Sequence, residues 1–263
     1  MKYLFVLVLI LFSCKDNKSI ALVESNTAEN ENFKGVEPTK PEETEVFKPV
    51  PPTVKVETKN GVPSDAIVLF DGSNLREWVH VKDSTAAKWI LNEDGSMTVK
   101  NKSGDIQTKR EFENVQLHIE WRSPAVIEGE GQSRANSGVF LQKRYEVQVL
   151  DNNNNDTYVN GQVGSIYKQH IPLVMASVAS GEWNTYDIIY HAPVFSEEGI
   201  KIQSGRLTLL HNGVLVHDNV VIKGTTAYIG WPKNDAHGKA PIQLQDHQDN
   251  SRVSYRNIWV REL

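Results

Sequence analysis

A row of polar side chains near the middle of the chain is the feature best suited to chemistry. Residues 145–149 read Tyr-Glu-Val-Gln-Val, and in a strand this alternation puts Glu146 and Gln148 on one face and the apolar side chains on the other. Asp151 follows at the start of an Asn-rich turn. A carboxylate and an amide that share a face over an apolar core form the wall of a polar groove, and many β-sandwich proteins hold sugars in such grooves. The spacing therefore predicts saccharide recognition, with acid–base chemistry available to the carboxyl groups.

The same segment can be compared with the catalytic strand of retaining jelly-roll glucanases, which has the form E-x-D-x-x-E. In this register the chain reads Glu146-Val-Gln148-Val-Leu-Asp151, so the middle acid is an amide and the last acid is one methylene shorter. Residues five apart lie on opposite faces of a regular strand unless a bulge re-aims one of them. Retaining hydrolysis needs carboxyl groups about 5–5.5 Å apart. The sequence therefore disfavours a standard glucanase mechanism.

The placements of both carboxylates leave alternatives open. Glu146 could face the groove, or it could form a buried salt bridge with Arg134 or Arg122. We favour the groove because Gln148 shares the same face and burying two polar groups is costly. Asp151 either serves the site or only starts the Asn-rich turn.

Polar and aromatic residues elsewhere complete the set of candidates. His247 either contacts a ligand or caps the turn before Asp249. Glu120 faces either the groove or the solvent, because it alternates with apolar neighbours. Trp231 stands in a Gly- and Asn-rich loop and is a candidate to stack on a sugar ring. The predicted substrate-binding residues are Gln148, Gln245, Asn136, Arg134, Glu120, Tyr167 and Trp231.

Short strands must position these side chains. Between residues 63 and 263, runs of Trp, Tyr, Val and Ile alternate with Gly, Asn, Asp and Pro, and long helical periodicity is absent. The segment His211-Asn212-Gly213-Val214 is typical of a hairpin with a type I′ turn. Many short strands without helical crossovers predict one all-β domain, an antiparallel β-sandwich. The predicted strands are Ile67–Phe70, Trp89–Leu91, Ser96–Val99, Asp105–Thr108, Val115–Trp121, Gly138–Leu141, Glu146–Val149, Trp183–Tyr190, Arg206–His211, Val214–His217, Tyr228–Gly230, Ile242–Gln245 and Val253–Val260.

Residues 1–14 predict export. Lys2 precedes the apolar run Tyr3–Phe12, which has the proportions of a signal peptide and is too short to span a bilayer. The run ends at Leu-Phe-Ser-Cys, which is similar to a bacterial lipobox, and Cys14 is the only cysteine in the chain. We therefore expect acylation of Cys14 and a protein that is lipid-anchored to the cell envelope, on the periplasmic or the surface face. An ordinary secretory signal with a chance cysteine is the alternative.

Residues 15–62 predict a disordered tether between the lipid and the domain at 63–263. They hold five of the eleven prolines and none of the six tryptophans. Such a segment buries too little apolar surface to offset its chain entropy. The net charge of −5 and the scattered basic residues exclude a nucleic-acid-binding stripe.

A series of motifs gives the chain a family resemblance over nearly all of residues 65–263. They are Leu69-Phe70-Asp71-Gly72, Leu117-His118-Ile119-Glu120-Trp121-Arg122, Asn136-Ser137-Gly138-Val139-Phe140-Leu141, Tyr145-Glu146-Val147-Gln148-Val149-Leu150-Asp151, Gly164-Ser165-Ile166-Tyr167, Gly181-Glu182-Trp183-Asn184, His211-Asn212-Gly213, Leu244-Gln245-Asp246-His247 and Tyr255-Arg256-Asn257-Ile258-Trp259. In this order they resemble the DUF1080 family, also called the 3-keto-disaccharide hydrolase domain. The chain departs from the family at Gln248, where members usually carry Gly after the His.

The resemblance implies a concanavalin-like jelly roll that acts on or binds a saccharide. Some members of the family cleave glycosides whose sugar has been oxidised to a ketone at C3, and others have no known activity. A sugar oxidoreductase is therefore an expected partner, because it would supply the ketone. A non-catalytic carbohydrate-binding lipoprotein is the main alternative, and a structural lipoprotein without a sugar site is the third.

The 3-keto reaction needs one base and one group that stabilises an oxyanion. The ketone acidifies the C2 proton; a base removes it, the C1 oxygen leaves, and water then adds to the enone. We expect His247 as the base, because an ordinary histidine titrates near working pH, with Glu146 and Asp151 as alternatives. Gln148, Gln245, Asn136 and Arg134 are the expected donors to sugar or enolate oxygens. A divalent cation would suit enolate stabilisation, but no spacing matches a dedicated metal motif and the metal requirement stays open.

Overall fold

The computed structural model describes residues 37–56 and 61–263. The predicted signal peptide, with Cys14, and the first part of the predicted tether lie outside these residues. The chain divides into two compact units, Met1–Pro52 and Thr53–Leu263. In the first unit the described residues are exposed and contain one short 3-10 turn, η1 (Pro41–Glu43).

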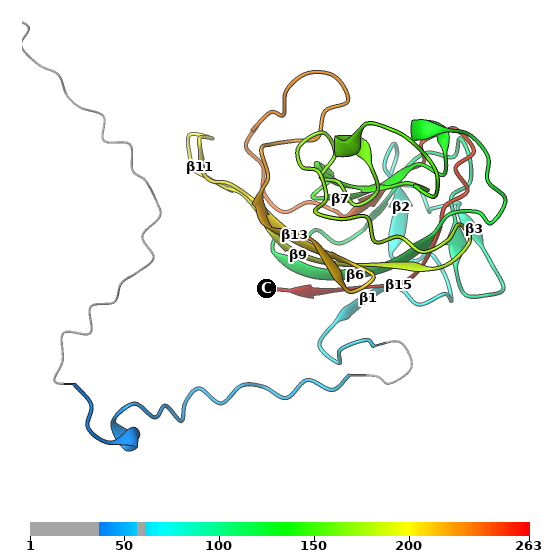
Figure 1. Cartoon of the computed structure of the whole chain (residues 1–263). Helices are drawn as coiled ribbons and strands as arrows, with labels where there is room; N and C mark the ends of the chain where they lie inside the picture. The colour runs from blue at the N-terminus through cyan, green and yellow to red at the C-terminus, as the bar shows by residue number, and fades with distance from the viewer. Residues whose placement is uncertain (1–36, 57–60) are drawn as a thin grey trace, which may run out of the picture. The chain divides into compact units, whose positions relative to one another are not determined.

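Two antiparallel β-sheets packed face to face make up the second unit, which confirms the predicted all-β, concanavalin-like sandwich (Figure 1). In the larger sheet the order is β13 (Val214–Val221), β12 (Arg206–His211), β9 (Asn184–His191), β6 (Val115–Arg122), β15 (Ser254–Glu262), β4 (Met97–Thr98) and β3 (Ile90–Leu91), and β1 (Ile67–Phe70) also pairs with β15. In the smaller sheet the order is β2 (Trp78–His80), β5 (Ile106–Thr108), β14 (Gln243–Leu244), β7 (Ser137–Leu141) and β8 (Tyr145–Val149). A separate ribbon consists of β10 (Val194–Phe195) and β11 (Lys201–Gln203).

The core lies between the two sheets because their strands alternate in polarity. In β6, Leu117, Ile119 and Trp121 are fully buried, while the residues between them face outward. From the smaller sheet, Val147 and Val149 of β8 add to the same core cluster. Each such side chain contributes about 1.5–3 kcal/mol of transfer free energy on burial, which is enough to hold two sheets together without a disulfide.

Turn chemistry fixes the register of the β12–β13 hairpin. Asn212 and Gly213 both have positive φ angles, 53° and 76°, as a type I′ turn requires. The hairpin predicted from the sequence is confirmed.

One predicted strand is wrong and three strands were missed. Tyr228–Gly230 forms bends in a loop, since the Tyr228 and Ile229 side chains are largely exposed and no neighbouring strand pairs with them. The sequence did not predict β2, β10 or β11, which have two or three residues each and are too short to show a period.

The start of the second unit includes part of the predicted tether. Val56 forms an antiparallel bridge with Pro63, and the Lys55 N–H donates to Ser64 Oγ at 3.1 Å. Within the described ranges, no helix has the length and apolar character needed to cross a membrane.

Candidate functional site

Polar side chains of three neighbouring strands meet on the outer face of the smaller sheet. Glu146 on β8 pairs with Phe140 on β7, and Gln148 pairs with Gly138. Gln245 follows β14, and its N–H donates to the Gly138 carbonyl oxygen at 3.1 Å. The structure thus brings the mid-chain and C-terminal candidates into one pocket of about 260 Å³. Its lining residues are Asn136, Phe140, Glu146, Gln148, Tyr167, Thr226, Tyr228, Gln245 and His247.

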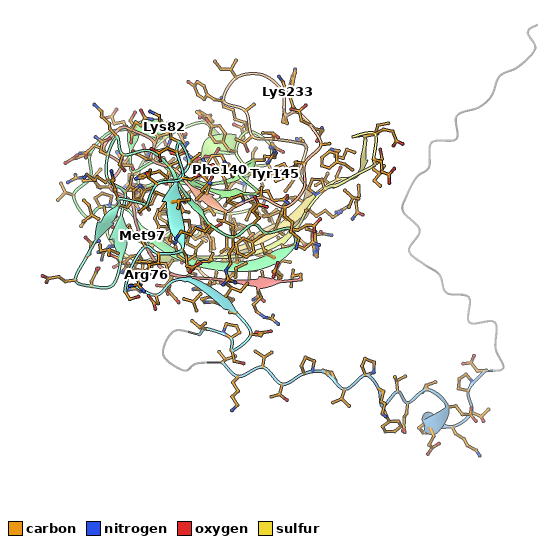
Figure 2. All side chains as sticks on the ribbon, turned by 180° about the vertical axis from the view of Figure 1, so that it is seen from behind. Arg76, Lys82, Met97, Phe140, Tyr145 and Lys233 are labelled. Atoms are coloured by element: carbon orange, nitrogen blue, oxygen red, sulfur yellow. The ribbon has the colours of Figure 1, made fainter. Side chains whose placement is uncertain are left out.

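Two loops form the walls of this pocket. The segment 164–167 runs along the free edge of β8, where the Tyr167 N–H donates to the Glu146 carbonyl oxygen at 3.1 Å. The second loop, residues 224–238, brings Thr226 Oγ1 to the Glu146 N–H at 3.1 Å. Lys233, on this loop, stands beyond Phe140 and Tyr145 on the side away from the larger sheet (Figure 2). The loop therefore rises over the pocket side of the smaller sheet.

Glu146 is a buried carboxyl group at the bottom of the pocket. Its side chain is 5% exposed, and among the described residues no group donates a hydrogen bond to its carboxylate. Burial, followed by the negative charge of Asp105, raises the pKa of Glu146 to about 8. At neutral pH this group is mostly protonated, so it can donate a hydrogen bond.

Gln148 presents an acceptor to the pocket, and a chain of amides fixes this orientation. The Gln132 amide nitrogen donates to the Gly161 carbonyl oxygen at 2.9 Å, so its Oε1 is an acceptor. The Asn136 amide nitrogen donates to the Gln132 carbonyl oxygen at 2.7 Å, so its Oδ1 is an acceptor too. The Gln148 amide nitrogen donates to both acceptors, at 3.3 and 3.2 Å. Because both ends of the chain rest on backbone carbonyls, the amides cannot be flipped without breaking these bonds.

The remaining Gln148 Oε1 is buried and has no donor among the described residues, and the same is true of Gln245 Oε1. The sequence predicted Gln148 as a donor, whereas its amide nitrogen is already used and the atom left free is an acceptor. An unpaired buried acceptor costs about 1–3 kcal/mol, so the pocket favours a ligand that brings hydroxyl groups.

His247 stands at the rim of the pocket and is paired with a carboxylate. Its Nδ1 lies 2.7 Å from Asp249 Oδ2, and 37% of its side chain is exposed. A carboxylate on Nδ1 fixes the ring and its tautomer and leaves Nε2 available as a base. The sequence left open whether His247 contacts a ligand or caps the turn before Asp249; the structure places it in the pocket lining and also bonds it to Asp249 within the turn.

Comparison of the chain with known proteins identifies its family. The sequence matches the family described as the 3-keto-alpha-glucoside-1,2-lyase-like domain over residues 65–261. The chain belongs to this family. It is also 53% identical to a candidate glycosyl hydrolase from Parabacteroides distasonis, with a TM-score of 0.83, over 87% of this chain and 99% of that one.

Two further structures from Parabacteroides distasonis share the fold of this lyase-like domain. Both are named as candidate glycosyl hydrolases; they are 18% and 22% identical, with TM-scores of 0.57 and 0.53. The matches cover 76% and 75% of this chain and 94% and 99% of theirs. No curated protein matches the chain. The predicted family is confirmed, and the chain is a carbohydrate-active domain related to 3-keto-glucoside lyases.

Asp151 and Arg134 lie outside the pocket of the lyase-like domain. The Asp151 carboxylate accepts hydrogen bonds from Asn153 and Ser180, at 3.0 and 2.6 Å, so it holds the turn. Arg134 donates to the carbonyl oxygens of Gly129 and Asn153. Both residues line a separate hollow of about 290 Å³.

Glu120 and Trp231 are also outside the lining of this pocket. Glu120 faces outward from the larger sheet, where Arg256 Nε donates to it at 2.6 Å, and it borders another hollow of about 760 Å³. Trp231 is 89% exposed on the loop that contributes Thr226 and Tyr228. The structure thus separates Glu120 from the pocket by the whole sandwich, while Trp231 stays on a loop that borders it.

Sequence reasoning missed Phe140, Thr226 and Tyr228 in the lining, and the pairing of Asp249 with His247. Phe140 is the residue of β7 that pairs with Glu146 of β8. It could have been predicted only if the register between these two strands were known, and nothing in the sequence set that register. Thr226 and Tyr228 belong to a loop whose position depends on long-range contacts. Within the described part of the chain, no group of three or more His, Cys, Asp or Glu side chains is arranged to hold a metal ion.

The loop that carries His247 of the lyase-like domain is strained. Gln248, Asn250 and Arg252 have φ angles of 63°, 63° and 49°, a region that favours glycine. Family members usually have Gly at the position of Gln248, so this chain keeps the turn at a cost of about 1 kcal/mol.

Replacing Gln248 with Gly is therefore expected to raise the free energy of unfolding by about 0.5–1 kcal/mol, since Gly adopts the left-handed conformation without strain. Urea unfolding of the domain measures this change. Gln248→Ala is the matched control; it keeps the Cβ and should leave stability within about 0.3 kcal/mol. Equal stabilisation by Gly and Ala would show that the Gln side chain, and not the backbone, carries the strain.

Proposed function

We propose that the domain cleaves 3-keto-glycosides by removing the C2 proton, eliminating the C1 substituent and adding water to the enone. The observation that carries the proposal is the buried Glu146 carboxyl group, whose pKa is raised by burial, in one small pocket with the Asp249-paired His247. Glu146 and His247 thus have different environments, and such differences are how enzymes assign one group as the acid and another as the base.

The base in this proposal is His247. Its Nε2 takes the C2 proton while the Asp249 carboxylate holds the Nδ1 proton and stabilises the imidazolium that forms. Because C2 lies next to the ketone, the electron pair left on C2 spreads to the C3 oxygen as an enolate.

Glu146 donates to that oxygen. A carboxylic acid that is kept neutral by burial can hydrogen-bond a carbonyl oxygen and strengthen the bond as negative charge develops there. The enolate then reforms the ketone, the C1–O bond breaks with its electron pair on oxygen, and a 1,2-ene-3-one remains. Addition of water across this double bond gives the 3-keto sugar, so the overall reaction is hydrolysis.

The free amide oxygens of Gln148 and Gln245 provide the specificity. Each accepts a hydrogen bond from a sugar hydroxyl, and a deoxygenated sugar would leave these acceptors unpaired. Exposed Trp231 and the pocket residue Tyr228 stand on one loop and are the stacking surface for a second ring.

The decisive experiment compares a 3-keto-glucoside with its non-oxidised parent, using the purified domain and measuring released aglycone. Turnover of the 3-keto-glucoside alone is the expected result. Turnover of the parent alone, or of neither, would refute cleavage through the 3-keto sugar. Saccharide affinity without turnover, unchanged in Glu146→Ala and His247→Ala, would indicate a non-catalytic binding protein instead.

Gly138 creates the space that Glu146 occupies. A Cβ at Gly138 would lie 2.6 Å from Glu146 Oε1 and 2.7 Å from the Phe140 ring. Gly138→Ala is expected to lower kcat/KM about tenfold or more by displacing the carboxyl group, with about 1–2 kcal/mol of stability lost. Steady-state kinetics and urea unfolding measure both. Gly238→Ala is the control, since a Cβ there has no neighbour within 4 Å; a larger loss in the control would contradict the argument.

We also propose that the protein is exported and anchored by a lipid on Cys14, where a sugar oxidoreductase could supply its substrate. Cells grown with labelled palmitate should label the wild type and fail to label Cys14→Ser. Labelling of the serine variant would contradict the anchor.

A further inference from the structure

We propose that Tyr167 is the catalytic acid that protonates the departing C1 oxygen, with Tyr158 and Lys168 as its supporting residues. This inference rests on the elimination proposed above, in which His247 and Glu146 act at C2 and at the C3 oxygen. Neither residue protonates the leaving group, and an alkoxide is too basic to leave without a proton.

The position of Tyr167 fits this role. It lines the pocket with Glu146, is only 8% exposed, and its own N–H bonds the Glu146 carbonyl oxygen at 3.1 Å. Its phenol oxygen lies 2.5 Å from the phenol oxygen of Tyr158. Tyr158 is 39% exposed, so the pair connects the pocket to solvent through two hydroxyl groups.

A cation lies over the phenol pair. The Lys168 ammonium is 5.5 Å from the ring centres of both Tyr158 and Tyr167 and 4.5 Å from that of Tyr228. Its Nζ is held by the Tyr228 carbonyl oxygen at 2.6 Å. A positive charge at this place stabilises a tyrosinate once the proton has been given away.

The protonation state of the Tyr167 phenol is that of a proton donor. Burial first, and then the hydrogen bond with Tyr158 and the nearby charges, raise the pKa of Tyr167 above its ordinary value of 10. The phenol therefore keeps its proton at neutral pH until a stronger base, the alkoxide, develops beside it.

The backbone is strained to hold this arrangement. Lys168 has a φ angle of 57°, in the left-handed region that is unfavourable for residues with a side chain. A Cβ on Gly161 would lie 1.9 Å from the Tyr158 ring, so only glycine lets that ring lie across the turn η3 (Val159–Gly161). Strain of this kind is common at functional sites.

The proposed step is balanced. The C2 proton moves to His247 Nε2, and its electron pair becomes the C1–C2 double bond. The C1–O bond breaks with its electrons on oxygen, and the Tyr167 hydroxyl proton neutralises that oxygen to give the free alcohol. Tyr158 then donates its proton to Tyr167 and recovers one from solvent, while His247 returns its own proton to solvent.

The test uses two 3-keto-glucosides that differ only in the leaving group. Methanol needs a proton in order to leave, whereas 4-nitrophenolate does not. We expect Tyr167→Phe to reduce turnover of the methyl 3-keto-glucoside about 100-fold or more, and that of the 4-nitrophenyl 3-keto-glucoside less than about threefold. Tyr158→Phe should show the same selectivity with a loss of about tenfold.

Retained activity on the nitrophenyl substrate shows that each variant is folded. Tyr145→Phe is the matched control, because its phenol bonds His237 Nε2 outside the pocket; it should not alter the ratio of the two rates. Equal losses on both substrates, or no loss on either, would overturn the role of Tyr167. A wild type that turns over neither substrate would instead refute the elimination reaction itself.

Discussion

Replacing Glu146 with Gln is expected to lower kcat on a 3-keto-glucoside about 10²–10³-fold. The amide is close in size to the carboxylic acid, but it is a much weaker acid and gives the developing enolate a poorer hydrogen bond. KM should change little, because the ketone itself has much less negative charge than the enolate. Steady-state kinetics of the two proteins at pH 6.5 measure this difference.

The pH profile distinguishes a Glu146 that donates from one that accepts a proton. With a pKa of about 8, the wild-type kcat should fall as the pH rises through 8, and the Gln variant should lack this step. A wild-type rate that rises through pH 8 would make Glu146 the base and contradict its assignment as donor. Glu93→Gln, an exposed residue in the turn between β3 and β4, is the matched control and should behave as wild type.

The same carboxyl group should destabilise the fold at alkaline pH. Its pKa is raised from 4.5 to about 8, so the folded protein binds a proton that the unfolded chain has lost, and stability falls as the pH rises from about 4.5 through 8. Glu146→Gln should therefore be about 5 kcal/mol more stable than wild type at pH 9, or roughly 10–20 °C in Tm, and similar at pH 4. Thermal unfolding at both values checks the sign. A substitution that raises the stability of the protein and lowers its activity is typical of catalytic groups.

Local rules predicted much of this fold. Alternation along residues 145–149 correctly put Glu146 and Gln148 on the face opposite Val147. The Asn212-Gly213 turn was readable because positive φ angles restrict the residue types. Both features depend on neighbours within a few residues, and for that reason the sequence carries them.

Long-range register was not readable in the same way. Gln245 reaches Glu146 only because β14 pairs with β7, about a hundred residues away in sequence, and no periodicity specifies that pairing. The resemblance to the family supplied these candidates instead. The role of Asp151 could not be read from its residue type, because an aspartate can hold a turn or act in a binding site. Its place in the turn follows from the hydrogen bonds that Asn153 and Ser180 donate to it.

Loop 224–238 shows the same limit for an apolar run. Tyr228 and Ile229 have the composition of a strand, yet they stay exposed because no strand edge lies beside them. A pattern of residue types therefore gives the elements, but a pocket that is built from three strands and two loops needs the tertiary contacts.

His247→Ala is expected to lower kcat about 10³-fold, since no other described side chain of the pocket pairs an imidazole with a carboxylate. Asp249→Asn should lower kcat about 10–100-fold. The carboxylate 2.7 Å from His247 Nδ1 is then replaced by a neutral amide, which fixes the ring tautomer less well and does not stabilise the imidazolium. Both variants should retain saccharide affinity, as Glu146, Gln148 and Gln245 remain in place. Stopped assays with a 3-keto-glucoside measure the rates, and isothermal titration with the non-oxidised parent measures the binding.

Chemical rescue separates a base from a residue that only shapes the loop. Imidazole added to His247→Ala should restore part of the rate, and deuterium at C2 should slow the wild type, since breaking the C2–H bond is the step that His247 performs. His191→Ala, an exposed histidine at the end of β9, is the matched control and should keep full activity. If His247→Ala removed the C2 proton at the wild-type rate, as measured by exchange of that proton with deuterated solvent, the base would have to be another group. Glu146 is the carboxyl group in the pocket lining and would then be the candidate base, and a rate that rises through pH 8 would report this reversal.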